Sequence, residues 1–226
     1  MNHLKRIGLI HATPLAVAPI AASFERLWPQ AQLQNLLDDS LSLDRARDGL
    51  LTEAMTQRFI DLSQYALRCG CEAILFTCSA FGPAIEAAAR AAPLPTFKPN
   101  QAMFDMALAT PRPNAVLHVG LLATFEPSIA SMVLELKTMA ERLGIALVIH
   151  TAHVPEAMDD LNRGEADLHH QKIAEAVTKL PFCDVIVLAQ FSMAAAQPWA
   201  QRQSTVPVLS SPDCAVSALH QRMMNV

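Results

Sequence analysis

Short apolar, β-branched runs alternate along this chain with longer segments whose apolar residues recur every three or four positions. The short runs predict buried strands at residues 6–11, 33–37, 72–77, 115–122, 145–150 and 184–189. The longer segments predict helices between them, most clearly at residues 48–68, 165–180 and 211–224. Strands that are apolar on both faces are typical of parallel sheets covered by helices on either side, so the pattern indicates an α/β fold.

An internal repeat at an offset of 112 residues is the most informative feature of this pattern. Residues 7–10 then fall on 119–122, 71–76 on 183–188, and 94–95 on 206–207. The aligned segments share a glycine, a cysteine followed by an acidic residue, and a Leu/Val–Pro pair. The repeat predicts two pseudo-symmetric parallel-sheet halves with helices on both faces and the active site between them.

The boundary between these halves is predicted in the Pro-rich stretch at residues 110–114, which lacks helix and strand character. The first half would comprise residues 1–110 together with 210–226, and the second half residues 111–209.

Composition and charge narrow the choice of partners. A hydrophobic fraction of 52% with 17% charged residues is that of a globular protein, and a net charge of −4 without a Lys/Arg cluster argues against nucleic-acid or membrane binding. The N-terminal segment lacks the apolar core of a signal peptide, which favours a cytoplasmic location. The five cysteines are an odd number and are expected to be reduced thiols.

Open parallel sheets bind ligands beyond the carboxyl ends of their strands. Polar residues at those ends are the candidate ligand-binding groups: Thr13, Cys78, Ser79, Thr124, Gln190 and Ser192. At the repeat offset, Cys78 falls on Gln190. The two residues should therefore approach one ligand from opposite halves.

Cys78 has the sequence context of a reactive thiol. It ends an apolar strand and precedes a predicted helix start with Pro83 in the first turn. Free backbone N–H groups there would lower the pKa of the thiol and would bind a carboxylate. The alternative is a buried, unreactive cysteine. For Cys69, Cys71, Cys183 and Cys214, packing is the favoured interpretation.

The histidines do not predict a metal site. His169 and His170 lie on a polar helix and are expected on a solvated face, while His11, His150 and His153 end strands and are expected to be scaffold or surface residues. The sequence contains no phosphate-binding glycine loop and no nucleophile elbow. We therefore expect neither a metal nor a cofactor.

Segments 7–10, 72–80, 119–124 and 184–189 together resemble the aspartate/glutamate racemase superfamily. That group includes amino-acid and hydantoin racemases, maleate isomerase and arylmalonate decarboxylase. The resemblance implies two opposed cysteines in a cleft: one thiolate removes the proton next to a carboxylate, and the other thiol returns a proton on the opposite face. It also implies that no cofactor is needed and that the protein is a homodimer.

Carried over by position, the first cysteine of this family is Cys78, and Ser79 and Ala80 follow at ligand-binding positions. The second cysteine falls on Gln190, with Phe191 and Ser192 in place of the usual Thr-Gly or Thr-His. Glutamine is not a useful acid or base, so a two-thiol racemisation is not expected.

Three functions remain open at this point. The first is a racemase- or isomerase-type enzyme acting on a small carboxylic acid, with Cys78 as its single acid/base or nucleophile and Gln190 as a hydrogen-bond donor. The second is a decarboxylase of malonate-like acids in which Cys78 protonates the product enediolate. The third is a non-catalytic descendant that binds a small acid. Apolar residues near the predicted cleft suggest a ligand less polar than aspartate: Phe81, Phe125, Phe191 and Met193.

Overall fold

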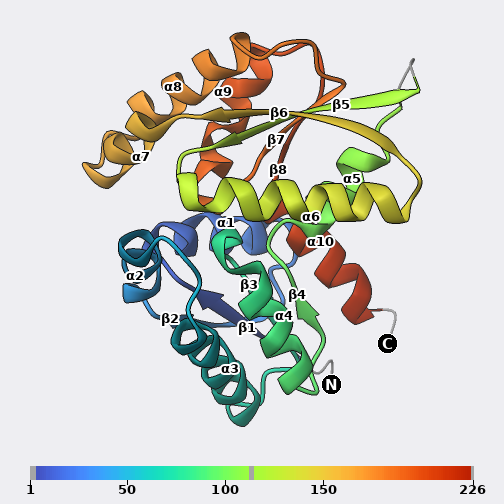
Figure 1. Cartoon of the computed structure of the whole chain (residues 1–226). Coiled ribbons are helices and arrows are strands. Elements are labelled where there is room, and N and C mark those ends of the chain that lie inside the picture. Colours follow the sequence, from blue (N-terminus) through green and yellow to red (C-terminus); the bar gives the residue numbers. More distant parts are fainter. Residues whose placement is uncertain (1–3, 112–114, 225–226) are drawn as a thin grey trace.

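The computed structural model describes residues 4–111 and 115–224 and contains two four-stranded parallel sheets, one in each half of the molecule (Figure 1). The first sheet has the order β2-β1-β3-β4, with strands β1 (Arg6–His11), β2 (Gln32–Leu37), β3 (Ala73–Phe76) and β4 (Thr96–Phe97). The second has the order β6-β5-β7-β8, with strands β5 (Val116–Ala123), β6 (Ala146–His153), β7 (Val185–Leu188) and β8 (Val208–Ser210).

Helices cover both faces of each sheet. Those up to the crossover are α1 (Val17–Leu27), α2 (Ser40–Asp48), α3 (Glu53–Arg68), α4 (Gly82–Ala91) and α5 (Gln101–Leu108). Those after it are α6 (Ile129–Arg142), α7 (Pro155–Asn162), α8 (Ala166–Thr178), α9 (Gln197–Arg202) and α10 (Ser211–Met224). Short 3-10 turns follow four of the strands: η1 (Pro14–Ala16), η2 (Ser79–Phe81), η3 (Glu126–Ser128) and η4 (Phe191–Ala196). No helix in the described part of the chain is both long and apolar enough to span a membrane.

The strand registers reproduce the repeat seen in the sequence. In the first sheet Ile7 is opposite Ala73, and in the second Val119 is opposite Val185. The outer pairs follow the same offset of 112, since β3 and β4 align at 74 and 96 and β7 and β8 at 186 and 208. The predicted fold class, two similar parallel-sheet halves with helices on both faces, is confirmed.

The shared glycine and cysteine of the repeat are explained by close packing beside the central strands. A Cβ atom on Gly8 would lie 3.4 Å from the Cys71 sulfur, and one on Gly120 would lie 3.2 Å from the Cys183 sulfur and 2.7 Å from Leu180. These cysteines therefore fill space next to a glycine, which agrees with their predicted packing role.

The acidic residue after each of these cysteines serves the same strand in both halves. Asp184 accepts the backbone N–H of His118 at 2.8 Å, and Glu72 accepts that of Arg6 at 3.3 Å. Each carboxylate satisfies an N–H group at the beginning of a central strand, which is why the repeat retains an acid here.

The predicted helix at 48–68 is wrong in its first turn, because the segment contains the last residue of one helix and the whole of the next. Helix α2 ends at Asp48 and is capped by Gly49, whose φ of 68° is left-handed. Helix α3 begins after Thr52, whose side chain accepts the backbone N–H of Met55 at 3.2 Å. The sequence pattern did not predict α2 or α7, both of which are short.

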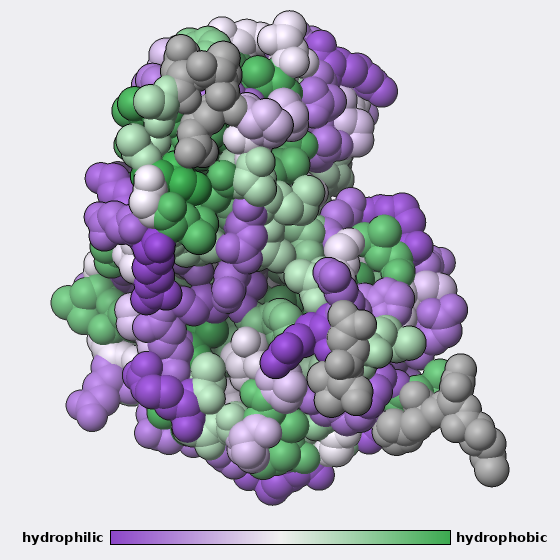
Figure 2. Space-filling model, turned by 90° about the vertical axis from the view of Figure 1, so that its right-hand side faces the viewer, coloured by the Kyte–Doolittle hydropathy of each residue, from purple (hydrophilic) through white to green (hydrophobic). Residues whose placement is uncertain are grey.

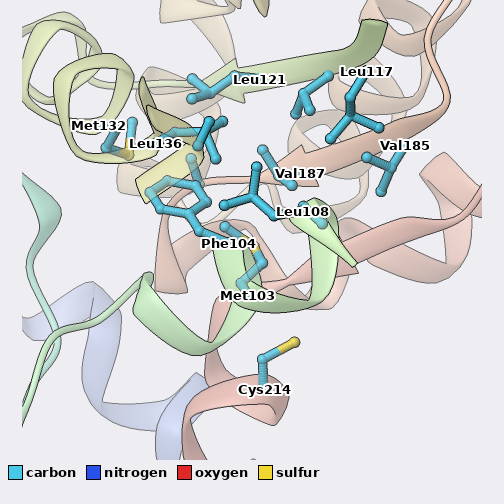
Figure 3. Packing of buried hydrophobic residues seen from close by; sticks show 14 of the residues in the cluster. Met103, Phe104, Leu108, Leu117, Leu121, Met132, Leu136, Val185, Val187 and Cys214 are labelled. Carbon is cyan, nitrogen blue, oxygen red and sulfur yellow. The ribbon is translucent and has the colours of Figure 1, made fainter. Parts of the chain in front are cut away.

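The last helix of each sequence repeat packs against the sheet of the other repeat. Helix α5 contributes Met103, Phe104 and Leu108 to the core beneath β5 and β7 (Figure 3). Helix α10 contributes Val216 and Leu219 to the core beneath β1 and β3.

This exchange bears on the proposed division of the chain. The boundary at residue 110 placed α5 in the first half, whereas its apolar side chains lie in the core of the second. Residues 112–114 of the proposed crossover lie outside the described residues.

Candidate active site

The carboxyl ends of the central strands from both sheets meet at a cavity of about 210 Å³. Six of the seven predicted site residues line it: Thr13, Cys78, Ser79, Ala80, Gln190 and Ser192. Cys78 and Gln190 follow β3 and β7 at equivalent positions, because the N–H groups of Thr77 and Ala189 each bond at 3.1 Å to the carbonyl of Ile10 and Leu122, respectively. The structure thus brings Cys78 and Gln190 to the same cavity from two halves.

Thr124, the seventh predicted residue, does not line the cavity but holds Gln190. Its backbone N–H and its hydroxyl donate to Gln190 Oε1 at 2.5 and 2.9 Å. Because Oε1 is occupied, the amide Nε2 is the part of Gln190 left to bind a ligand, and it can only donate.

The thiol of Cys78 is less acidic than the sequence predicted. Burial raises its pKa to about 11, and the opposing effects of hydrogen bonds from the Ala80 backbone and the Ser42 side chain are smaller. The predicted lowering of the pKa is wrong because burial outweighs the hydrogen bond that the thiol accepts from the Ala80 backbone in the turn η2. The resting group is a neutral thiol, which suits proton donation better than proton removal.

A buried histidine supports the strand end that carries Cys78. His11 Nδ1 lies 2.8 Å from Thr77 Oγ1, and its Nε2 lies 2.9 Å from Asn35 Oδ1. Burial lowers the pKa of His11, although the hydrogen bond to Asn35 acts in the opposite direction. His11 is completely buried and does not line the cavity, so its contacts are those of a scaffold residue.

The predicted surface position of His169 is wrong. It was expected on a solvated face but is fully buried, with Nδ1 lying 2.8 Å from the carbonyl of Ala157 in α7. His150 also lies away from the cavity, where its Nε2 is 3.2 Å from Nδ1 of His118. Within residues 4–111 and 115–224, no group of three or more His, Cys, Asp or Glu side chains could hold a metal ion.

Sequence reasoning missed the walls of the cavity that come from α2 and α7. These helices supply Ser42, Leu43 and Ala46 from the first half and Met158 and Asn162 from the second. Neither helix was predicted, so no sequence signal had been connected with these residues.

The apolar residues expected near the cleft divide into two groups. Phe125 and Phe191 line the cavity, whereas Phe81 and Met193 are completely buried in the cores of the two halves. None of the described residues that line the cavity is Asp, Glu, Lys, Arg or His. A bound anion would therefore depend on hydroxyl, amide and backbone N–H donors.

A second cavity, of about 580 Å³, opens between β4, α5 and α10 and contains none of the predicted site residues. Helix α10 lies on the right of Figure 1, the side turned toward the viewer in Figure 2, where polar residues are spread over both halves with apolar ones between them.

The sequence matches the family model of Asp/Glu/hydantoin racemases over residues 18–219. The chain belongs to this family. A glutamate racemase from Bacillus anthracis superposes with a TM-score of 0.75 at 16% identity, covering 100% of this chain and 83% of that one. An aspartate racemase homologue from Pyrococcus horikoshii gives 0.70 at 17% identity, covering 98% of this chain and 100% of that one.

A third racemase-fold structure is a glutamate racemase from Francisella tularensis in complex with D-glutamate, with a TM-score of 0.68 at 12% identity over 98% of this chain and 81% of that one. A search among curated protein sequences gives no match. At these identities the likeness to the solved racemases is one of fold. The chemistry of this family member has to be argued from its own cavity.

Proposed function

We propose that the protein is a cofactor-independent enzyme of the racemase/isomerase type that acts at the carbon next to a carboxylate. Cys78 is its single catalytic thiol, and Gln190 takes the place of the second. The observation that carries this proposal is the equivalence of Cys78 and Gln190, which line one cavity at the same point of the two halves.

The proposed chemistry needs one proton carrier and one hydrogen-bond donor. Cys78, as the thiolate, removes the proton from the α-carbon, and the electron pair of the broken C–H bond moves into the carboxylate to form an enediolate. The Nε2 group of Gln190 donates a hydrogen bond to an oxygen of this enediolate, where negative charge develops. The thiol then returns a proton to carbon on its own face, which exchanges the α-proton with solvent, and net inversion requires water to supply the proton on the opposite face while the thiol proton passes to the hydroxide left behind.

The raised pKa of Cys78 favours a second candidate, a decarboxylase of malonate-like acids. There the C–C bond to one carboxylate breaks, carbon dioxide leaves, and the electron pair remains as an enediolate. The neutral thiol protonates the α-carbon, and water reprotonates the sulfur. This reaction begins from the protonated thiol, the form that a pKa of about 11 maintains at neutral pH.

Incubation with a panel of small carboxylic acids in deuterated water, followed by proton NMR, tests both candidates. D-glutamate belongs in the panel because a structural relative binds it. Exchange at an α-carbon supports the first candidate, and loss of carbon dioxide with deuterium in the product supports the second.

Cys78→Ser should abolish either signal, whereas Cys69→Ser, a change at a partly exposed thiol outside the cavity, should leave it intact. Binding without any reaction would leave only a small-acid-binding role.

A further inference from the structure

The helices α2 and α7 are repeat mates that lie on the same side of the molecule, one in each half (Figure 1). Leu33 of β2 pairs with Ile7 and Ile149 of β6 pairs with Val119, so this part of the repeat has an offset of 116 residues, four more than in the central strands. At that offset α2 falls on residues 156–164 and overlaps α7 to within two residues at either end, and the buried Leu41 falls on the buried Ala157.

Both helices carry an Asp–Arg ion pair at equivalent positions of the repeat. Asp44 bonds to Arg47 at 3.0 Å, and its counterpart Asp160 bonds to Arg163 at 2.5 Å. Each aspartate also holds a cation on the following helix: Asp44 contacts Arg58 at 2.8 Å, and Asp160 contacts Lys172 at 2.5 Å. The two helices differ at most positions, but each keeps an Asp–Arg pair and an ion pair to the following helix.

The differences between the two helices include the positions that face the cavity. Ser42 is replaced in the second half by Met158, and Ala46 by Asn162, and all four residues line the cavity. Ser42 hydrogen bonds to the thiol of Cys78. Met158 stands at the corresponding position of the half that carries Gln190. At this pair of positions the first wall thus offers a hydroxyl to the reactive thiol and the second an apolar side chain, while at the other pair Ala46 is replaced by the polar Asn162.

We infer that Met158 determines substrate specificity, by selecting a small carboxylic acid with an apolar substituent and rejecting acids with a second charged group. This inference rests on the proposed function and names its substrate class. A second carboxylate placed beside Met158 would lose its hydration, and the described lining residues offer it no cation. An apolar substituent there would instead bury surface against Met158 and Phe125.

The nearby arginines of the two helices do not supply the missing charge. Arg47 and Arg163 are paired with their aspartates. Arg45 of α2 has Nε and Nη1 buried without a hydrogen-bond partner, but it does not line the cavity.

Two probes of nearly equal shape, glutarate and 5-methylhexanoate, test the inference through dissociation constants measured by NMR titration. The unmodified protein should bind 5-methylhexanoate at least about tenfold more tightly than glutarate. Met158→Lys should reverse that preference. Met158→Gln, similar in length but uncharged, should weaken 5-methylhexanoate without admitting glutarate. Asp159→Lys, at the exposed neighbouring position outside the cavity, should leave the preference unchanged.

Equal or tighter binding of glutarate by the unmodified protein would overturn the inference, as would failure to bind 5-methylhexanoate. Loss of glutarate binding in Arg45→Met would show that Arg45 is the counter-ion and would also overturn it. These measurements need no turnover. Absence of deuterium incorporation would therefore count against the proposed function and not against this selectivity.

Discussion

Thr124 fixes the side chain of Gln190 through two hydrogen bonds to the same oxygen, at 2.5 Å from its backbone N–H and 2.9 Å from its hydroxyl. The amide is therefore oriented before any ligand arrives, and its Nε2 group donates no hydrogen bond to another described residue. A cysteine at position 190 would accept these bonds poorly, so this site is built around a glutamine and not around a second acid/base residue.

Gln190→Cys should add the second proton carrier that racemisation requires. We expect the unmodified protein to racemise aspartate and glutamate poorly or not at all. With an acid that binds, the variant should exchange the α-proton and the solution should then lose its optical activity. Polarimetry and proton NMR in deuterated water measure the two events.

Cys78→Ser in the Gln190→Cys background is the control, and it should abolish racemisation because one face again lacks a thiol. Efficient racemisation by the unmodified protein would mean that another group supplies the second proton.

The reactivity of Cys78 toward iodoacetamide should be low at neutral pH and should rise about tenfold per pH unit up to its pKa of about 11, because the thiolate is the nucleophile. Peptide mass spectrometry at several pH values measures the rate at each cysteine. Cys69 and Cys78 are both partly exposed, but Cys78 should be labelled more slowly than Cys69 at pH 7 because burial raises its pKa. A rapid, pH-independent rate at Cys78 would contradict the effect of burial described above.

Alkaline solution should destabilise the protein through its buried thiols. Burial raises the pKa of Cys78, Cys183 and Cys214 from 9.0 to about 11 in the folded state. The unfolded chain therefore releases these protons first, so the free energy of unfolding is fully retained below pH 9 and falls as the pH rises toward 11. Urea denaturation at pH 7, 9 and 10 measures the loss.

Cys183→Ala should reduce that pH dependence, although it also removes a packed side chain and lowers stability at every pH. An unfolding free energy that is constant from pH 8 to 10.5 would argue against these raised pKa values.

Lys172→Met should destabilise the protein by about 1–2 kcal/mol, because it removes one of two cations from a carboxylate that is otherwise buried. Asp160 is only 1% exposed, and its remaining partner, Arg163, is 57% exposed. Lys179→Met, near the end of the same helix, is the matched control and should change the unfolding free energy little. Equal urea midpoints for the two variants would show that the Asp160 pair is not an anchor of α7.

The sequence predicted the central architecture because each residue type conserved between the two repeats makes a specific contact beside a central strand. Gly8 and Gly120 leave room for a cysteine sulfur, and an acidic side chain satisfies a strand N–H in each half. Such contacts require particular residue types at a fixed spacing, so the repeat is visible without a structure.

The remainder of the site was missed for a different reason. Met158 and Asn162 follow an outer strand, and short helices such as α7 carry too little periodicity to be recognised alone. The repeated pairs Asp44–Arg47 and Asp160–Arg163 would have revealed both helices, but only at the offset of 116 that the four-residue insertion creates. The acidity of Cys78 was mispredicted because the extent of its burial depends on residues distant in sequence.

The exchange of α5 and α10 between the two repeats is consistent with an origin of this chain by duplication of a half-length ancestor. These helices occupy corresponding places, each being the last element of its half, and each packs against the other half's sheet. A half-length ancestor would have left its final helix without a core of its own. Two copies trading that helix would form a domain-swapped dimer, and joining them end to end would yield the present arrangement as a single polypeptide. Cutting the chain between the halves should accordingly give two fragments that fold only together.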